Sequence, residues 1–206
     1  MVEGAILIDR RDDKGDKAGQ RRMLQARRAG LSVSERMAAA DAVADHVATH
    51  AQFNIPGYVA GYWATRAELP LHALQLRLRA DQVWCLPVVQ ADGGLMFGPW
   101  RQGDPLVSNR YGIPEPDLAA GSLIAPQDLS LVLLPLLGVD RSGHRLGMGG
   151  GYYDRAFAFR HDRRPPPFLV GIAYACQAVP ALPSDAWDVA LDALATEHGL
   201  RHFDRD

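Results

Sequence analysis

The sequence predicts an α/β fold with helices on both faces of a central sheet. Apolar segments of strand length alternate along the chain with segments of helical periodicity, which is the pattern of βα units. One apolar segment, residues 131–139, is almost continuous and ends at a turn signal, as a strand buried on both faces should. A glycine-rich loop follows this segment and opens a helix, an arrangement that can bind an anion.

The individual elements follow in order from periodicity and from start and stop signals. A first helix is expected from Lys17 to about Ala29, with Gly30 as its C-terminal stop. The second helix opens at a capping box formed by Ser32 and Glu35. Strands are expected over residues 58–64, 83–89, 131–139, 168–175 and 189–196, a hairpin partner over 95–100, and further helices after Pro70 and from Tyr153 to Arg160.

Length and composition restrict the class of protein. The 206 residues are expected to form a single domain, with residues 1–16 poorly ordered. A net charge of −2 gives no general attraction to nucleic acid or to an anionic membrane. The first residues lack a signal peptide's apolar run, and no stretch is long enough to span a membrane. We therefore expect a cytoplasmic protein whose partners are small molecules, with no nucleic acid and no membrane among them.

The loop over residues 147–151 has four glycines within five residues: Gly147, Gly149, Gly150 and Gly151. Glycine costs conformational entropy and packs no side chain, so the loop is best explained by backbone N–H groups that approach an anion. Arg145 and Arg155 flank it and can pair with phosphate oxygens. The loop matches neither the dinucleotide motif nor the Walker A motif. A flexible linker is the less favoured alternative, since linkers do not usually follow a buried strand.

This stretch resembles the signature of the 5-formyltetrahydrofolate cyclo-ligase family, also called methenyltetrahydrofolate synthetases. That family has a strand ending in Pro and Asp, followed by Arg-Leu-Gly-x-Gly-x-Gly-Tyr-Tyr-Asp, which matches Pro135, Asp140 and residues 145–154 here. The resemblance extends from Lys17 to Glu197. It implies a three-layer α/β/α sandwich with a mixed, mostly parallel central sheet. It also implies a ligase of one-carbon metabolism that uses ATP and Mg²⁺ to cyclise 5-formyltetrahydrofolate to 5,10-methenyltetrahydrofolate, releasing ADP and phosphate. A monomer is expected.

Lys17 and Arg21 are four residues apart and so lie on one helical face. Two like charges repel there unless an anion neutralises them, and a solvated basic face is the alternative explanation. The family has a Lys and an Arg at this spacing before a Leu-Ser pair, which is Leu31-Ser32 here. The resemblance implies that both side chains reach the ATP phosphates.

Two residues at the end of the first expected strand or just after it are implied to contact the reduced folate. Glu68 lies where the family has a folate-binding Glu, although it could instead cap the next helix. Trp63 would line the pteridine pocket, since an aromatic side chain suits a flat heterocycle. Tyr152 and Tyr153 could stack on the folate or form hydrogen bonds with it.

Asp154 and Asp188 are the carboxylates that the resemblance assigns to Mg²⁺, a cation that favours few carboxylates together with phosphate oxygens and water. The alternatives are a first-turn helix acid for Asp154 and a turn acid for Asp188. Trp187 replaces the family's usual His beside Asp188 and could alter the pocket wall.

The complete set of residues implied by the resemblance falls into three further groups. The catalytic residues are Lys17, Arg145 and Tyr153; the ATP-binding residues are Lys17, Arg21, Arg145, Gly147, Met148, Gly149, Gly150, Gly151, Tyr152, Tyr153 and Asp154; and the substrate-binding residues are Trp63, Glu68, Gly149, Gly150, Gly151, Tyr152 and Tyr153.

Three rival functions come from other classes: a kinase or ligase with another small acceptor, a non-catalytic module that binds nucleotide or RNA, and a sugar-phosphate isomerase-like protein that needs no ATP. The presence of Lys17, Arg21, Glu68 and Asp154 argues against a loss of catalysis. The near-neutral net charge argues against RNA binding.

Overall fold

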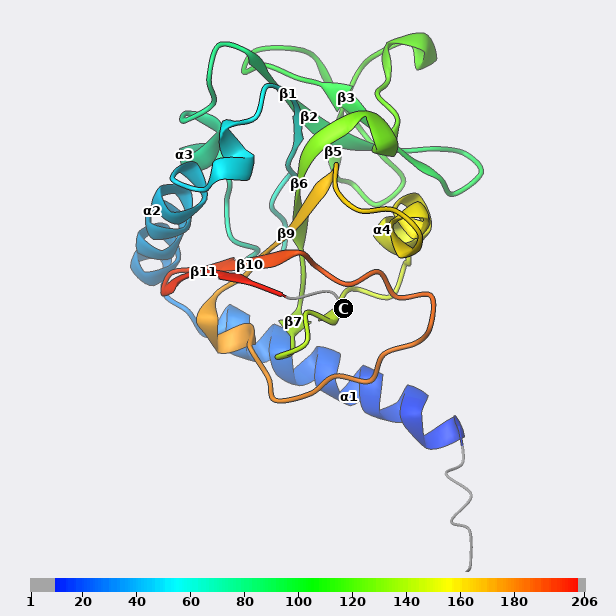
Figure 1. Ribbon diagram of the computed structural model, residues 1–206. Coiled ribbons are helices and arrows are strands. Elements are labelled where there is room, and N and C mark those ends of the chain that lie inside the picture. Colours follow the sequence, from blue (N-terminus) through cyan, green and yellow to red (C-terminus); the bar gives the residue numbers. More distant parts are fainter. Residues whose placement is uncertain (1–9, 204–206) are drawn as a thin grey trace, which may run out of the picture.

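A computed structural model describes residues 10–203, with side chains from Lys17 onward. Its centre is a seven-stranded sheet in which the five inner strands are parallel and both edge strands are antiparallel to their neighbours (Figure 1). The predicted mixed, mostly parallel sheet is therefore confirmed. In sheet order the strands are β11 (Gly199–His202), β10 (Ala193–Thr196), β9 (Phe168–Ile172), β6 (Leu129–Pro135), β1 (Gly57–Ala60), β2 (Gln82–Val89) and β3 (Leu95–Pro99).

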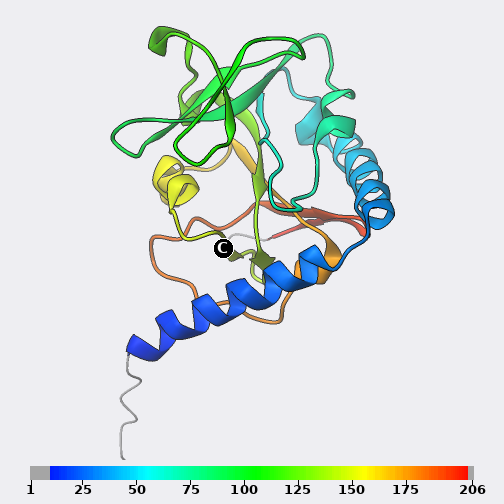
Figure 2. The same ribbon diagram turned by 180° about the vertical axis from the view of Figure 1, so that it is seen from behind.

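Helices cover both faces of this sheet, as the predicted three-layer sandwich requires (Figures 1 and 2). Successive side chains of β6 point to opposite faces. Leu131 and Leu133 join the core beneath α2 and α3, while Val132 and Leu134 join the core beneath α4. The helices are α1 (Arg10–Ala29), α2 (Val33–Ala48), α3 (His72–Gln75) and α4 (Tyr152–Ala156), and the short 3-10 turns are η1 (Ala51–Asn54), η2 (Ala120–Ser122), η3 (Pro126–Asp128), η4 (Ala158–His161) and η5 (Ala175–Gln177).

Helix α1 runs across one end of the molecule, beside a two-stranded ribbon (Figure 1). Leu24 of α1 packs with Leu137 and Leu146 in a small separate core. A Cβ on Gly138 would lie 2.6 Å from Leu24 Cδ1, so this close approach requires a glycine. The ribbon pairs β7 (Gly138–Val139) with β8 (Arg145–Leu146), and a second ribbon pairs β4 (Leu106–Ser108) with β5 (Pro114–Pro116).

The apolar run 131–139 is two elements and not the single strand that was predicted. Strand β6 ends at Pro135, and Gly138–Val139 belongs to the ribbon that leads to the glycine loop. Leu136 and Leu137 form the bend between them, where Gln177 Nε2 donates to both of their carbonyl oxygens at 2.7 and 3.0 Å. Both leucines are buried, so the run is continuous in hydrophobicity although the chain changes direction within it.

Other boundaries also differ from the prediction. The capping box is present, with Ser32 N donating to Glu35 Oε2 at 2.7 Å and Glu35 N donating to Ser32 Oγ at 3.2 Å. Helix α1 begins at Arg10 and not at Lys17, so residues 10–16 are helical, while residues 1–9 lie outside the described part. The helix after Pro70 is a single turn, strands β1, β9 and β10 are shorter than expected, and β11 was not predicted. No helix within residues 10–203 is long and apolar enough to cross a membrane.

Candidate active site at the glycine loop

The candidate site lies where the strand order of the sheet reverses. Strands β1 and β6 are parallel neighbours, but the chain continues from β1 to β2 on one side and from β6 to β9 on the other. In open α/β sheets, ligands bind in the crevice outside the carboxyl ends of strands at such a switch point. The segment after β1 carries Trp63 and Glu68, and the segment after β6 carries the glycine loop. Residues predicted for both substrates therefore leave the sheet at one place.

The glycine loop connects β8 to α4 and uses backbone conformations that favour glycine. Gly149 has a φ of +95° and Gly151 a φ of +65°, a region in which side chains with a Cβ are strained. A Cβ on Gly149 would also lie 3.4 Å from Arg21 Nη2. Helix α4 is only 5 residues long, so its dipole adds little and anion binding here depends on the loop amides and nearby cations.

Helix α1 brings Arg21 to this loop and Lys17 to Asp185 and Asp188. Arg21 Nε donates to the carbonyl oxygen of Gly147 at 2.9 Å. Lys17 Nζ lies 2.7 Å from Asp185 Oδ2 and 3.8 Å from Asp188 Oδ2. The Lys17 side chain is only 15% exposed, so this face of α1 is packed against the protein and is not the solvated basic face considered as an alternative.

Arg145 is the most enclosed cation beside the loop. Its Nη2 lies 2.5 Å from Asp154 Oδ1, and its Nη1 donates to the carbonyl oxygen of Val189. Val189 N also donates to Asp154 Oδ1, at 3.2 Å. Burial lowers the pKa of Arg145, and the charges of Asp154 and Asp188 oppose that shift. The three predicted residues Arg145, Asp154 and Asp188 thus share one electrostatic environment.

Tyr153 and Glu68 are both partly buried and lie close enough for their charges to interact, although 85 positions in the sequence separate them. Burial is the main cause that raises the pKa of Tyr153, followed by the Glu68 carboxylate, while Arg145 lowers it. Burial also raises the pKa of Tyr62 far above its ordinary value, with Glu68 and Tyr153 adding to the shift. Glu68 Oε2 accepts a hydrogen bond from Thr65 N at 2.8 Å. The charge of Glu68 therefore acts on Tyr153, and both residues are predicted to bind folate.

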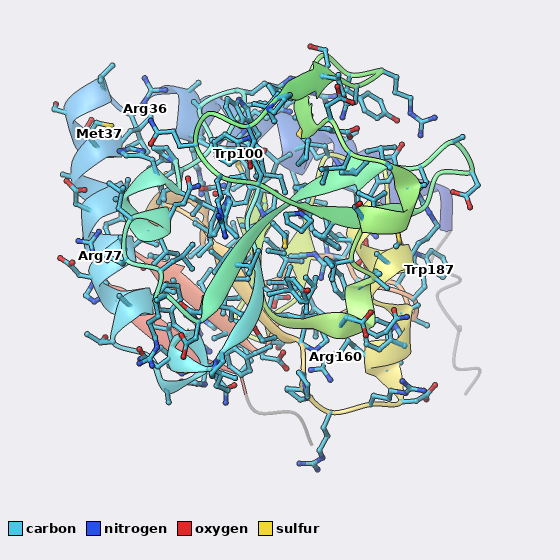
Figure 3. The ribbon with its side chains drawn as sticks, turned by 90° about the horizontal axis from the view of Figure 1, so that it is seen from above. Arg36, Met37, Arg77, Trp100, Arg160 and Trp187 are labelled. Carbon is cyan, nitrogen blue, oxygen red and sulfur yellow. The ribbon has the colours of Figure 1, made fainter. Side chains whose placement is uncertain are left out.

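Trp63 and Tyr152 are placed differently from this pair. Trp63 is 38% exposed and packs edge to face against Trp100, with ring centroids 5.8 Å apart; Trp100 is labelled in Figure 3. The Tyr152 hydroxyl lies 2.5 Å from Tyr111 Oη and accepts a hydrogen bond from Arg110 Nη2 at 2.5 Å. Tyr152 therefore faces the β4–β5 ribbon and not Tyr153's buried environment.

Several polar residues of this region were missed from the sequence, namely Arg28, Tyr62, Arg110, Tyr111 and Asp185. Arg110 and Tyr111 directly precede Gly112-Ile113-Pro114-Glu115-Pro116, a stretch whose prolines indicate a rigid loop, so their position offered a signal. Arg28 sits in a helix end and Asp185 in a loop, and neither stands in a motif.

The two predicted magnesium ligands each keep one carboxylate oxygen available. Asp154 Oδ1 pairs with Arg145, and Asp188 Oδ2 accepts a hydrogen bond from Asp185 N at 2.9 Å. Hydrogen bonds among the described residues engage neither Asp154 Oδ2 nor Asp188 Oδ1. Within residues 17–203 no three acidic, His or Cys side chains cluster into a metal site of their own. The donor set fits a cation that takes few protein ligands and completes its shell with phosphate oxygens and water.

The suggested effect of Trp187 on the pocket wall stays a prediction. The Trp187 side chain is 67% exposed and lies at the periphery of the molecule (Figure 3). Its backbone carbonyl lies 3.3 Å from His161 Nε2. The substitution of the usual His therefore changes an exposed position.

One hollow on the described surface lies apart from this site. It has a volume of about 200 Å³ and lies between α1 and residues 179–181, lined by Gln20, Met23, Leu24 and Arg27. None of the predicted site residues lines it. The candidate site is therefore located by its charged side chains and not by a hollow. Its cations are paired with carboxylates, which a bound phosphate would have to displace.

Comparison with known proteins places this geometry in a family. The 5-formyltetrahydrofolate cyclo-ligase family profile matches residues 13–197. The chain is 33% identical over 178 residues to the 5-formyltetrahydrofolate cyclo-ligase of Escherichia coli K12, covering 84% of this chain and 96% of that protein. The Haemophilus influenzae protein of the same name is 32% identical over 168 residues, covering 80% and 88%. The solution structure of the Aquifex aeolicus 5,10-methenyltetrahydrofolate synthetase superposes with a TM-score of 0.77 at 28% identity, covering 92% of this chain and 94% of that chain.

Proposed function

This chain belongs to the 5-formyltetrahydrofolate cyclo-ligase family, and from that premise we infer that it converts 5-formyltetrahydrofolate and ATP to 5,10-methenyltetrahydrofolate, ADP and phosphate. One observation supports this inference most strongly. The glycine loop, which Arg21 contacts and Arg145 precedes, and the segment with Glu68 both follow strands that meet at the switch point of the sheet, so an anionic and a heterocyclic substrate can lie side by side.

The chemistry explains why the site needs cations and has no strong nucleophile. The formyl oxygen is a poor leaving group until the γ-phosphoryl group of ATP is transferred to it. N10 of the folate then attacks the activated formyl carbon, and ring closure expels phosphate. Phosphoryl transfer requires positioning and charge stabilisation more than covalent chemistry by the protein.

We assign the phosphate side of the reaction to Lys17, Arg21, Arg145 and the glycine loop. Arg21 already contacts the loop, and its neighbour Lys17 is paired with Asp185. When ATP binds, Lys17 would exchange this carboxylate for phosphate oxygens. The loop amides of residues 147–151 would donate to the same oxygens.

We assign the folate side to Trp63, Glu68 and Tyr153. A carboxylate accepts hydrogen bonds from the N–H groups of a pterin, which suits Glu68. Because the pKa of Tyr153 is raised, its hydroxyl stays protonated and can donate a hydrogen bond. Tyr152 then belongs to the outer edge of the site, where it contacts Arg110 and Tyr111.

We further propose that Asp154 and Asp188 hold Mg²⁺ together with the ATP phosphates. Their available oxygens and their common environment around Arg145 support this assignment. The bound cation would neutralise charge on the transferring phosphoryl group. The cytoplasmic location and the monomeric state remain predictions.

A direct assay tests the proposed reaction. The purified chain is mixed with ATP, Mg²⁺ and 5-formyltetrahydrofolate, and the absorbance of the methenyl product is followed against a control without ATP, which measures non-enzymatic cyclisation. We expect a rate that depends on enzyme and on ATP. If no methenyl product forms above the control and folate does not stimulate ATP hydrolysis, the proposed function is wrong.

A further inference from the structure

We propose that Arg28 is a positioning residue for the substrate: it joins the segments that follow β1 and β6, and it fixes the Glu68 carboxylate toward the bound folate. This inference rests on the proposed function, because it specifies how the proposed folate-binding carboxylate is oriented.

Arg28 differs from the other arginines of its helix end in being buried. It is 2% exposed, while its neighbours Arg22 and Arg27 are exposed. A cation in the last turn of a helix is favoured by the helix dipole when it faces water. Burying its charge is unfavourable unless hydrogen bonds and an opposite charge compensate it. The partners of Arg28 therefore indicate why it is buried.

These partners come from the two segments that leave the sheet at the switch point. Arg28 Nη2 donates to the carbonyl oxygen of Arg66, after β1, at 2.9 Å. Arg28 Nη1 donates to the carbonyl oxygen of Leu136, after β6, at 3.5 Å, and lies 3.8 Å from Glu68 Oε1. The guanidinium thus touches both sides of the crevice. Glu68 is the carboxylate that pairs with it among the described residues.

The segment that Arg28 holds has an unfavourable backbone conformation. Arg66 and Ala67 have φ values of +47° and +63°, and neither is a glycine. Such residues persist only where surrounding structure determines them, and they occur preferentially at functional sites. The carbonyl to which Arg28 donates belongs to the first of these two residues. Glu68 follows directly, and its backbone N–H closes the turn on Thr65 O at 2.8 Å.

The carboxylate itself is held from both sides. Glu68 Oε2 accepts hydrogen bonds from Thr65 N at 2.8 Å and from Thr65 Oγ1 at 3.2 Å, while Oε1 faces Arg28. Arg28 therefore acts on Glu68 twice, through the charge pair and through the backbone of the turn. Because the Arg28 side chain is only 3% exposed, it is a support for the site and not a ligand of the folate.

The test compares Arg28→Met with Arg27→Met, which removes the same charge from the exposed neighbouring position. We expect Arg28→Met to raise the KM for 5-formyltetrahydrofolate and the Kd from tryptophan fluorescence by roughly tenfold, as loss of a charge-assisted hydrogen bond does. The KM for ATP should change less than about twofold. Arg27→Met should leave all three values unchanged. An Arg28→Met protein that is less stable to heat but has the parental KM and Kd for folate would show that Arg28 is structural only.

A double-mutant cycle with Glu68→Gln tests whether Arg28 acts through Glu68. If it does, Arg28→Met should weaken folate binding in the parent but much less in the Glu68→Gln background. Equal effects in both backgrounds would overturn the proposal. Should Arg28→Met fail to fold, Arg28→Lys replaces it in the same cycle. Lysine keeps the positive charge but lacks the planar guanidinium that donates to both segments. A parent that makes no methenyl product would instead contradict the proposed function, so the two failures are distinguishable.

Discussion

Lys17 Nζ lies 2.7 Å from Asp185 Oδ2, and this ion pair joins helix α1 to the loop that precedes β10. The two residues are 168 positions apart, and no sequence motif connects them. Lys17 Nζ also lies 3.8 Å from Asp188 Oδ2, so two carboxylates of this loop surround the cation. If Lys17 binds the ATP phosphates as we propose, the nucleotide must displace this ion pair.

The basic pair on α1 gives the first prediction. Lys17→Ala and Arg21→Ala should each weaken ATP binding by about 1.5–3 kcal/mol, the range for a lost hydrogen bond to a charged group. Folate affinity should stay nearly unchanged. The measurement is the KM for each substrate, and Arg22→Ala, at an exposed position of the same helix, is the matched control. Parental ATP affinity in both variants would show that this face does not serve the nucleotide.

Gly149 gives the second prediction. Gly149→Val should abolish phosphate binding, because a branched side chain is strained at a φ of +95° and its Cβ would approach Arg21 Nη2 to 3.4 Å. The fold should survive, as seen by circular dichroism. Gly103→Val is the control for strain alone, since Gly103 has a φ of +101° with no atom within 4 Å of an added Cβ. Equal losses of activity in the two variants would argue against a phosphate role for Gly149.

Asp154 gives the third prediction. Asp154→Asn should lower the maximal rate and raise the Mg²⁺ concentration needed for half of it, because a neutral amide is a weaker ligand for a hard cation. Asp188→Asn should act in the same direction but less strongly. Asp162→Asn, at an exposed position after η4, is the control. If the Asp154 variant shows an unchanged Mg²⁺ titration and only a lower melting temperature, Asp154 serves solely as the partner of Arg145.

The raised pKa of Tyr153 gives the fourth prediction, a dependence on pH. The folded-state pKa lies above the ordinary value of about 10, so the neutral phenol stabilises the fold below that pH. That contribution is lost as the pH rises from the ordinary value through the higher folded-state pKa. Tyrosinate absorbance, compared between the parent and Tyr153→Phe, should show ionisation of Tyr153 only above pH 10. Ionisation at or below the ordinary pKa would show that the hydroxyl is in contact with water and not partly buried beside Glu68.

The sequence was sufficient for the class of fold and for the glycine loop, since both depend on local signals. Strand-length apolar runs predicted the parallel sheet, and the four glycines within residues 147–151 predicted a loop there; its role as an anion site stays a prediction. The bend at Leu136–Leu137 was missed because both leucines are buried, like the strand residues before them. Hydrophobicity alone does not distinguish such a bend from a continuous strand.

The missing parts of the site depend on tertiary contacts. Arg28 reads as a solvated helix end, and only the return of the chain at Arg66 and Leu136 buries it. Tyr152 and Tyr153 are adjacent in sequence, yet one faces the β4–β5 ribbon and the other a buried carboxylate, as adjacent positions on a helix point in different directions. Periodicity could not assign these two directions, because α4 is too short to show a pattern.

The stoichiometry of the reaction tests the central claim most directly. ADP and methenyl product are measured together as the purified chain turns over 5-formyltetrahydrofolate, ATP and Mg²⁺, with Lys17→Ala and Glu68→Gln in parallel. The account predicts equal amounts of the two products in the parent, and a loss of both together in each variant. ATP hydrolysis that proceeds without folate, or methenyl formation that proceeds without ATP, would contradict it.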